Sequence, residues 1–546
     1  MKYYYKKYFP FKTPRKEQDE AIKFALKSFI EEDKRFVILE MPTGTGKSGC
    51  ALTISKFLQN HYRWTKKQSE NYKVGAYFLT TQRLLQDQYE NDFGPPHGDM
   101  QSIKSATNYK CHYLRGNTCS EGLQLLKETK ADSPFKRSCG NGNCKYLCQK
   151  RFFLESMSSI TNFPYFLTET THVGGIAPRK VLVIDEAHNL ESEIGKHVEV
   201  VISENFANRI LKIDMPNTQS MKRSFDWVKE KYREAIVRCL NEYLEKQAEL
   251  VDVEGRSSEN YKKLLKQTDK IQSHLSKVDN FIRIYDKNNW IFNVIEPQGM
   301  AGRKFEFKPI DIGEFAEKFV FRYGAKVLLM SATILNKEAY CESIGVNPKD
   351  VAFISLDSPF PTENRPIYFL PAGKMNMNNI DKSLPKMKAI ITDILSVHNN
   401  EKGIIHCRTF KIARYIKNNI KSNRLLIHST ENKDFTLKEH LTSDKPTVFI
   451  SPSSTEGLDL KGNLSRFQVV CKIYWPYLGD KLVLARKQKH KRWYAYQAAK
   501  AIVQSLGRSI RNENDHAVSY ILDESWESFY RNNQDLFPNY FKKALQ

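Results

Sequence analysis

RFVILEMPTGTGKS, residues 35–48, joins a short apolar run to a glycine-rich loop. The apolar run is typical of a buried parallel strand, and helical spacing follows the loop as far as Asn60. A strand, a loop and a helix in this order present backbone N–H groups and a helix N-terminus to phosphate groups. The segment therefore predicts a nucleotide-binding loop on an α/β domain.

The loop supplies the side chains that bound ATP requires. We expect Lys47 to reach the β- and γ-phosphates and Ser48 to hold Mg²⁺. Met41 stands where the strict pattern of such loops has glycine, so the prediction rests on TGTGKS at 43–48. An ordinary glycine-rich turn is the alternative. The candidate ATP-binding residues of the loop are Pro42, Thr43, Gly44, Thr45, Gly46, Lys47 and Ser48.

An acidic pair ends another apolar run, KVLVI at 180–184. Asp185 can bind Mg²⁺ directly or through water, and Glu186 can orient and deprotonate an attacking water. A solvated helix N-cap would also place an Asp–Glu pair after a strand. The phosphate loop upstream on the same α/β unit favours the catalytic interpretation.

Positive charge for the γ-phosphate is found in QSLGRSIR at 504–511. Arg508 and Arg511 are three residues apart and share one helical face, and Gln504 lies one turn before Arg508. Phosphoryl transfer needs such charge on the far side of the γ-phosphate. A basic surface helix is the alternative.

Most of the chain alternates between helical and strand patterns. Helical spacing covers Lys16–Ile30 and Gln82–Tyr89, and Val74–Thr80 has a strand pattern between them. Repeats of this kind predict a doubly wound α/β domain. Further strands are expected at Lys326–Met330 and, in a second α/β unit that starts near Arg365, at Ile367–Leu370, Gly403–His406, Leu425–His428, Thr447–Ser451, Val469–Ile473 and Val518–Leu522.

Two segments interrupt this alternation. Residues 101–150 are rich in Gly, Asn, Ser and Cys and have no strong periodicity, which predicts a small inserted module. Residues 201–300 contain only two prolines and two glycines. Because 225–250 and 261–285 have amphipathic helical spacing, we expect this segment to be an inserted helical subdomain.

Composition narrows the function classes. The apolar fraction of 40% excludes global disorder. The net charge of +23, from 85 basic and 62 acidic residues, favours a polyanionic partner such as nucleic acid, with solubility alone as the alternative. No apolar run approaches the ~18–20 residues of a membrane span, and MKYYYKK at 1–7 has no apolar signal region. We expect an intracellular protein, cytoplasmic or nucleoid-associated, with no membrane partner.

Five of the ten cysteines lie between Cys111 and Cys148. In an intracellular chain, clustered cysteines are metal ligands more often than disulfides. Thiolates in a set of four hold either Zn²⁺ or an iron–sulfur cluster, and the spacings alone do not favour the cluster. The five candidates are Cys111, Cys119, Cys139, Cys144 and Cys148.

Further motifs follow one another along nearly the whole chain. They are Arg15 with Gln18, TTQRLLQDQ at 80–88, DEAH at 185–188, SAT at 331–333, IIHCRTF at 404–410, STEGLD at 454–459 and QSLGRSIR at 504–511. Most are weak individually, but their joint order is specific. Together with the two inserts, they resemble the XPD/DinG family of iron–sulfur, DEAH-box helicases of superfamily 2.

The resemblance implies an α/β fold: two RecA-like parallel-sheet motor domains with ATP between them, the first of which carries an inserted iron–sulfur module and an inserted helical arch. The implied ranges are 1–100, 151–200 and 301–360 for the first motor domain, 101–150 for the module, 201–300 for the arch and 361–546 for the second motor domain. Gln18 and Asp459 join the expected ATP-binding residues. The expected catalytic residues are Lys47, Asp185, Glu186, His188, Gln504, Arg508 and Arg511.

The resemblance also favours a 4Fe–4S cluster over zinc. In the family, the first ligand follows an Asn–aromatic stretch, as Cys111 follows NY at 108–109. The last ligand precedes an aromatic residue by two positions, as Cys144 precedes Tyr146, although Lys145 replaces the usual proline. The segment ITNF at 160–163 departs from the family's Asn–His. The expected ligands are Cys111, Cys119, Cys139 and Cys144, with Cys148 as the spare.

The implied activity is ATP-dependent unwinding of DNA, with movement 5′ to 3′ on single-stranded DNA at a forked duplex and with ATP, Mg²⁺ and the cluster as cofactors. One alternative is a DEAH-type RNA helicase, which has no reason to carry the cysteine insert. Another is an ATP-driven nucleic-acid module that remodels its ligand without strand separation. KLVLARKQKHKR at 481–492, followed by aromatic residues, suits either a nucleic-acid groove or a solvated surface. The sequence does not indicate protein partners.

Overall fold

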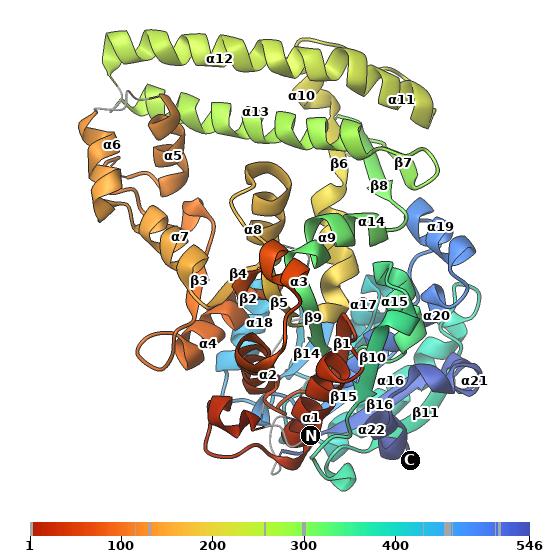
Figure 1. Ribbon diagram of the computed structural model, residues 1–546. Helices are drawn as coiled ribbons and strands as arrows, with labels where there is room; N and C mark the ends of the chain where they lie inside the picture. Colours follow the sequence, from red (N-terminus) through yellow and green to blue (C-terminus); the bar gives the residue numbers. More distant parts are fainter. Residues whose placement is uncertain are drawn as a thin grey trace.

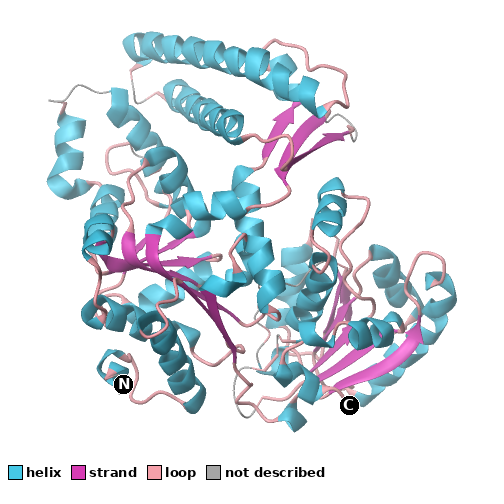
Figure 2. Ribbon diagram, turned by 45° about the vertical axis from the view of Figure 1, so that its right-hand side comes forward, coloured by secondary structure: helices cyan, strands magenta, loops and turns pink. Residues whose placement is uncertain are grey.

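The computed structural model describes residues 4–114, 116–128, 133–255, 258–297, 302–429, 431–452, 460, 462–507, 509–510 and 515–546. Two parallel β-sheets lie side by side in the lower half of the molecule, each with helices on both faces (Figures 1 and 2). A long helical hairpin spans the top (Figure 1). No described helix combines the length and the apolar character that crossing a membrane requires.

The first domain is built on a seven-stranded sheet in which all paired neighbours are parallel. Its order is β10 (Val351–Ser355), β1 (Phe36–Glu40), β9 (Gly324–Ser331), β5 (Arg179–Ile184), β2 (Lys73–Thr80), β4 (Ser158–Asn162) and β3 (Gln101–Ile103). Every residue of β1, β5 and β9 is buried, because helices cover both faces of a parallel sheet.

Alternate residues of these strands enter two separate cores. Val37 and Leu39 pack with α1 (Lys16–Ile30), α2 (Lys47–His61) and α4 (Arg83–Phe93). Phe36 and Ile38 belong to the core on the other face, with α8 (Phe163–Thr168), α9 (Leu190–Val198), α14 (Gly313–Phe319) and α15 (Lys337–Ile344). The two-residue period of the strand thus holds helices on both sides of the sheet.

The second domain contains a six-stranded sheet that is also parallel throughout. Its order is β11 (Ile367–Gly373), β16 (Val518–Asp523), β15 (Phe467–Val470), β12 (Gly403–His406), β14 (Val448–Ser451) and β13 (Leu425–Ile427). Its helices are α16 (Ile380–Val397), α17 (Phe410–Asn419), α18 (Lys433–Thr442), α19 (Lys481–Lys489), α20 (Trp493–Leu506), α21 (Ser525–Asn532) and α22 (Asn539–Ala544).

Two inserts leave the first sheet. The cysteine-rich insert lies between β3 and β4 and contains α5 (Cys119–Glu128), α6 (Pro134–Ser138) and α7 (Lys145–Glu155). The helical hairpin consists of α11 (Met221–Trp227), α12 (Arg233–Glu254) and α13 (Glu259–Ile284). It stands on a small antiparallel sheet in the order β6 (Val200–Ser203), β8 (Lys304–Pro309) and β7 (Trp290–Ile295).

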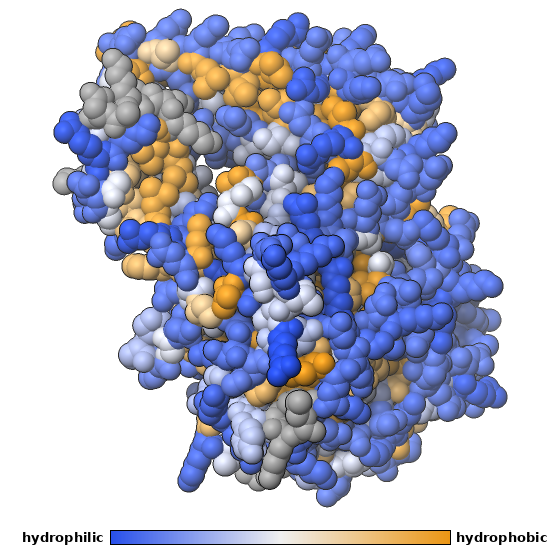
Figure 3. Space-filling model, viewed as in Figure 1, coloured by the Kyte–Doolittle hydropathy of each residue, from blue (hydrophilic) through white to orange (hydrophobic). Residues whose placement is uncertain are grey.

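The free end of the hairpin packs against the cysteine-rich insert (Figure 1). Leu125 and Phe135 of the insert share an apolar cluster with Tyr261 and Leu265 of α13. Lys266 lies 3.7 Å from Glu121, which adds an ion pair at the edge of the cluster. In Figure 3, hydrophobic side chains gather over these two elements on an otherwise mostly hydrophilic face.

The predicted elements agree with the structure where the sequence is strongly periodic. The helix expected at Lys16–Ile30 has these bounds, and α12 and α13 occupy most of the two amphipathic stretches. The strand expected at Val469–Ile473 is displaced, because β15 ends at Val470. The sequence predicted only helices for residues 201–300 and did not predict the antiparallel sheet. The strands β6 and β7 of this sheet lie at the two ends of that residue range.

Candidate functional site

The glycine-rich loop connects β1 to α2 through two left-handed residues. Gly44 has φ +81° and Gly46, the N-cap of α2, has φ +74°. The positive φ favours glycine at Gly46, and a Cβ there would lie 2.4 Å from Nε2 of Gln18 and displace that side chain. The loop delivers Lys47 and Ser48 into the first turn of α2, where backbone N–H groups are unpaired within the helix.

Gln18 holds the loop from behind. Its Nε2 donates to the Thr45 carbonyl at 2.9 Å, and its Oε1 accepts from the Arg15 N–H at 2.8 Å. The Arg15 guanidinium donates to the Gly44 carbonyl at 3.2 Å. Thr45 Oγ1 donates to the Pro42 carbonyl at 2.7 Å and closes the turn. The predicted pair Arg15 and Gln18 thus contacts the loop backbone.

Asp185 lies at the end of β5, and its backbone N–H donates to the Leu79 carbonyl of β2. Burial, and then the charge of Glu186, raise the pKa of Asp185 to about 6, whereas Lys47 acts in the opposite direction. The Lys47 ammonium therefore interacts electrostatically with the Asp185 carboxylate. Lys47 Nζ itself is 3.5 Å from the Met41 carbonyl.

Hydrogen bonds connect the DEAH segment to the second domain through SAT. His188 Nδ1 lies 2.8 Å from Ser331 Oγ and 3.2 Å from Glu186 Oε2. Ser331 Oγ also accepts from the Thr333 N–H at 3.0 Å. Gln504, on α20 of the second domain, donates to Thr333 Oγ1 at 3.1 Å. Three predicted motifs from two domains thus form one continuous network.

One interdomain pocket collects these groups. The Oε1 atom of Gln504 is buried there, and within the described ranges it has no hydrogen-bond partner. Such an atom is available to a ligand. The pocket is lined by residues of both domains, among them Pro42, Thr43, Glu186, His188, Thr333, Arg365, Gln504, Gly507 and Tyr540. Three predicted site residues, Asp459, Arg508 and Arg511, lie outside the described residues.

In the cysteine-rich insert, four of the five thiols lie close enough to affect one another's pKa. Burial, followed by Cys144 and Cys111, raises the pKa of Cys119 to about 12 and that of Cys139 to about 11. Cys148 instead donates to the Gly142 carbonyl at 3.1 Å. Over the part of the chain that the structure describes, no three His, Cys, Asp or Glu side chains are arranged as a closed metal site.

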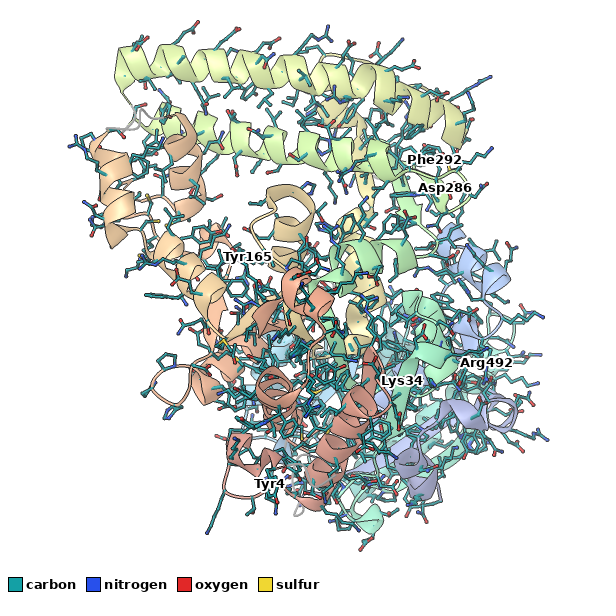
Figure 4. The ribbon with its side chains drawn as sticks, viewed as in Figure 1. Tyr4, Lys34, Tyr165, Asp286, Phe292 and Arg492 are labelled. Carbon is teal, nitrogen blue, oxygen red and sulfur yellow. The ribbon has the colours of Figure 1, made fainter. Side chains whose placement is uncertain are left out.

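The basic segment 481–492 makes contacts between the domains. Lys481 Nζ donates to the carbonyl of Phe292, which Figure 4 labels at the foot of the hairpin, at 3.0 Å. Arg486 lies 2.6 Å from Glu191, and His490 lies 2.6 Å from Asp311. Much of the charge that suggested a nucleic-acid groove is thus engaged with protein groups.

Comparisons with known proteins agree with this arrangement. The model of the Helicase C-terminal domain family matches residues 396–544, and that of the type III restriction enzyme res subunit matches residues 11–219. A solved structure described as an XPD helicase covers 96% of this chain and 99% of its own at 17% identity, with a TM-score of 0.62. The chain is thus similar in fold to the XPD helicase structure. Its two parallel-sheet domains are RecA-like.

Other proteins similar to this chain match at lower identity or over part of its length. The S. tokodaii Xpd4 structure covers 97% of the chain and 99% of its own at 13% identity, with a TM-score of 0.55. A DinG ATP-dependent DNA helicase of Photobacterium profundum is 26% identical over 242 residues, which are 40% of this chain and 34% of the relative. A probable ATP-dependent helicase of Methanocaldococcus jannaschii is 26% identical over 233 residues, which are 37% of this chain and 35% of the relative. The matched regions thus span about a third of these curated relatives.

The sequence did not single out two buried residues of this candidate site. Glu40 is fully buried at the end of β1, where burial raises its pKa, and it accepts from Ser355 Oγ at 2.5 Å and from the Leu335 N–H at 2.6 Å. It thereby fixes the loop after SAT, in which Leu335 has φ +65°. The available signal was a carboxylate inside an apolar strand. Tyr89, the second residue, donates to Asp185.

Proposed function

We propose that this chain is an ATP-dependent DNA helicase that translocates on single-stranded DNA, 5′ to 3′, and couples ATP hydrolysis to unwinding of forked duplexes. The observation that carries the proposal is the convergence of the phosphate loop, DEAH, SAT and Gln504 on one interdomain pocket. A nucleotide between two RecA-like domains can then change their separation. The similarity to the DinG ATP-dependent DNA helicase supports helicase activity, and the XPD structure supports the two-domain fold.

We assign the site residues as follows. Gln18 and Pro42–Ser48 would surround ATP, with Lys47 at its phosphates and Asp459 beside it. Glu186, with His188 near its carboxylate, would orient the attacking water. Arg508 and Arg511 would stabilise the transition state from the second domain. The buried, unsatisfied Oε1 of Gln504 supports this assignment, because it is a polar atom without a partner among the described residues beside the pocket.

Ser48 and Asp185 would hold Mg²⁺, which neutralises charge on the β- and γ-phosphates. Their oxygen atoms suit this hard cation, and the influence of Lys47 on Asp185 supports a shared phosphate–metal site. This chain's own contribution is to exclude water around Asp185, which is 4% exposed, and to hold the loop through Gln18.

For the cysteine-rich insert we propose a 4Fe–4S cluster on Cys111, Cys119, Cys139 and Cys144. The mutual influence of these thiols supports that set over one with Cys148, whose Sγ contacts Gly142. A bound cluster would supply a covalent cross-link for the insert, which has few apolar residues of its own.

We keep the proposed division of the chain into the domain ranges 1–100, 101–150, 151–200, 201–300, 301–360 and 361–546. We also propose that the protein acts in the cytoplasm or at the nucleoid.

The deciding experiment uses protein purified without oxygen. Forked, 5′-tailed and 3′-tailed duplexes of DNA and RNA are tested for ATP-dependent unwinding, with Lys47→Ala as the control. Unwinding of RNA alone, or ATP hydrolysis without any unwinding, would replace the proposal by an RNA helicase or a remodelling module.

A further inference from the structure

The hydroxyl of Tyr89 donates a hydrogen bond to Oδ2 of Asp185 at 2.9 Å. Tyr89 is 1% exposed and Asp185 is 4% exposed, so water does not compete for this contact. The two residues are 96 positions apart in sequence and meet because α4 packs on the strands beside β5. A buried tyrosine hydroxyl that bonds to a carboxylate fixes the rotation of that carboxylate.

The ring of Tyr89 is held independently of its hydroxyl. It packs against Phe78 of β2 at 6.0 Å and edge-on against Phe93 of α4 at 5.7 Å between ring centroids. One helical turn earlier, Gln86 is fully buried and donates to Ser102 Oγ and to the Ile103 carbonyl, both at 2.9 Å. The helix is thus anchored on the sheet, and it presents the hydroxyl from a rigid base.

The other oxygen of Asp185 is fixed from the opposite side. Its Oδ1 atom accepts from the Glu186 N–H at 2.9 Å. An ionised carboxylate offers about four acceptor positions, so one donor on each oxygen leaves acceptor capacity on both. The two donors therefore orient the group without using up the capacity that a cation or its water ligands need.

We propose that Tyr89 is a positioning residue for Mg²⁺, which holds the Asp185 carboxylate in the orientation that binds the cation of MgATP. This inference rests on the proposed function, in which Asp185 is a magnesium ligand. Removal of such a supporting hydrogen bond lowers metal affinity by about 10–100-fold in other sites. The affinity for nucleotide without metal does not depend on it.

The test compares Tyr89→Phe with a matched loss of a buried hydroxyl. Tyr77, also 1% exposed but on β2, donates to the Ala177 carbonyl at 3.0 Å, so Tyr77→Phe is the control. Binding of a fluorescent ATP analogue is measured in EDTA and at rising MgCl₂, and thermal unfolding confirms that both variants fold. We expect Tyr89→Phe to need about 10–100-fold more Mg²⁺ than wild type, with unchanged binding in EDTA. Tyr77→Phe should resemble wild type.

If Tyr89→Phe and Tyr77→Phe show the same Mg²⁺ dependence of nucleotide binding, the positioning role of Tyr89 is overturned, and the proposed function is unaffected. Wild-type protein that binds no nucleotide at any Mg²⁺ concentration would overturn the proposed function, and this inference with it. A second measurement adds Tyr89→Phe to Asp185→Asn. Because Tyr89 acts through Asp185, the added substitution should change Mg²⁺-dependent binding less than twofold, and a further tenfold loss would contradict the mechanism.

Discussion

Replacement of Glu191 by glutamine should loosen the junction between the two domains. Glu191 is 9% exposed on α9 and accepts hydrogen bonds from three side chains of the second domain. Arg486 lies 2.6 Å from Oε1, Trp493 Nε1 donates at 3.1 Å, and Gln497 Nε2 donates at 3.2 Å. The substitution keeps the shape of the side chain but leaves the Arg486 guanidinium buried without its counter-charge.

Removal of one partner of a buried ion pair costs about 3–5 kcal/mol. Arg486 retains a hydrogen bond to the Ile310 carbonyl at 2.7 Å, so we expect the lower end of this range. A loss of about 3 kcal/mol corresponds to a roughly 100-fold shift of the unfolding equilibrium. Urea unfolding followed by circular dichroism gives the free-energy difference from the midpoint and slope.

The matched control is an exposed ion pair. Asp357 lies 2.7 Å from Lys543 with both side chains more than half exposed, so Asp357→Asn should cost no more than about 1 kcal/mol. The double variant Glu191→Gln, Arg486→Met should regain much of the stability, because no buried charge is left unpaired. A Glu191→Gln protein no less stable than Asp357→Asn would refute the reasoning.

Three further predictions concern other parts of the molecule. Lys47→Ala should abolish ATP hydrolysis, and Glu186→Gln should still bind ATP and DNA but not turn over; full DNA-stimulated hydrolysis by either would contradict the assigned roles. Cys144→Ser should lose iron, sulfide and broad absorbance near ~400 nm, with some ATP hydrolysis retained, whereas Cys148→Ser should keep them; zinc without iron in anaerobic wild type would exclude the cluster. Burial lowers the pKa of His490, but hydrogen bonds to its two carboxylate partners outweigh this and raise it overall. The stabilisation of the folded protein by protonated His490 is complete below the unfolded pKa of ~6.5 and is lost as pH rises through the folded pKa. His490→Gln should therefore destabilise the protein more near pH ~6 than near pH ~9.

The strands of the two sheets were predictable where burial on both faces leaves only apolar residues. This holds for Phe36–Leu39 of β1 and Val181–Ile184 of β5, which are continuous apolar runs. It fails for β4, SSITN, in which Ser159 and Thr161 are buried because their hydroxyls donate to the carbonyls of Phe153 and Ile103. Single-sequence periodicity carries no record of such partners.

The strand β15 shows another limit. The apolar sequence continues past its end, since Cys471 and Ile473 are also fully buried. Ile473 leaves the ladder because its N–H donates to Asp523 at 3.1 Å, a partner 50 positions away. Pattern alone could not reveal where pairing stops.

Within the candidate site, spacing predicted Lys47, Asp185 and Gln504 because each stands in a motif. Tyr89 and Glu40 belong to no such spacing. Each is defined by a contact with a distant element: Tyr89 bonds to a residue of β5, and Glu40 to the loop after β9. Only the assembled sheet brings these partners together.

The order of strands in the first sheet has a consequence for synthesis on the ribosome. The interior strand β1 pairs only with β9 and β10 among the described strands, as Ile38 does with Leu329 and Phe353. At roughly 5–20 residues per second, the ~290 residues up to β9 require about 15–60 s of translation. During that interval the apolar β1 has no strand partner. The unpaired strand is then open to protease, so protease pulses on ribosome-bound chains should cleave near residues 36–40 until β9 has emerged.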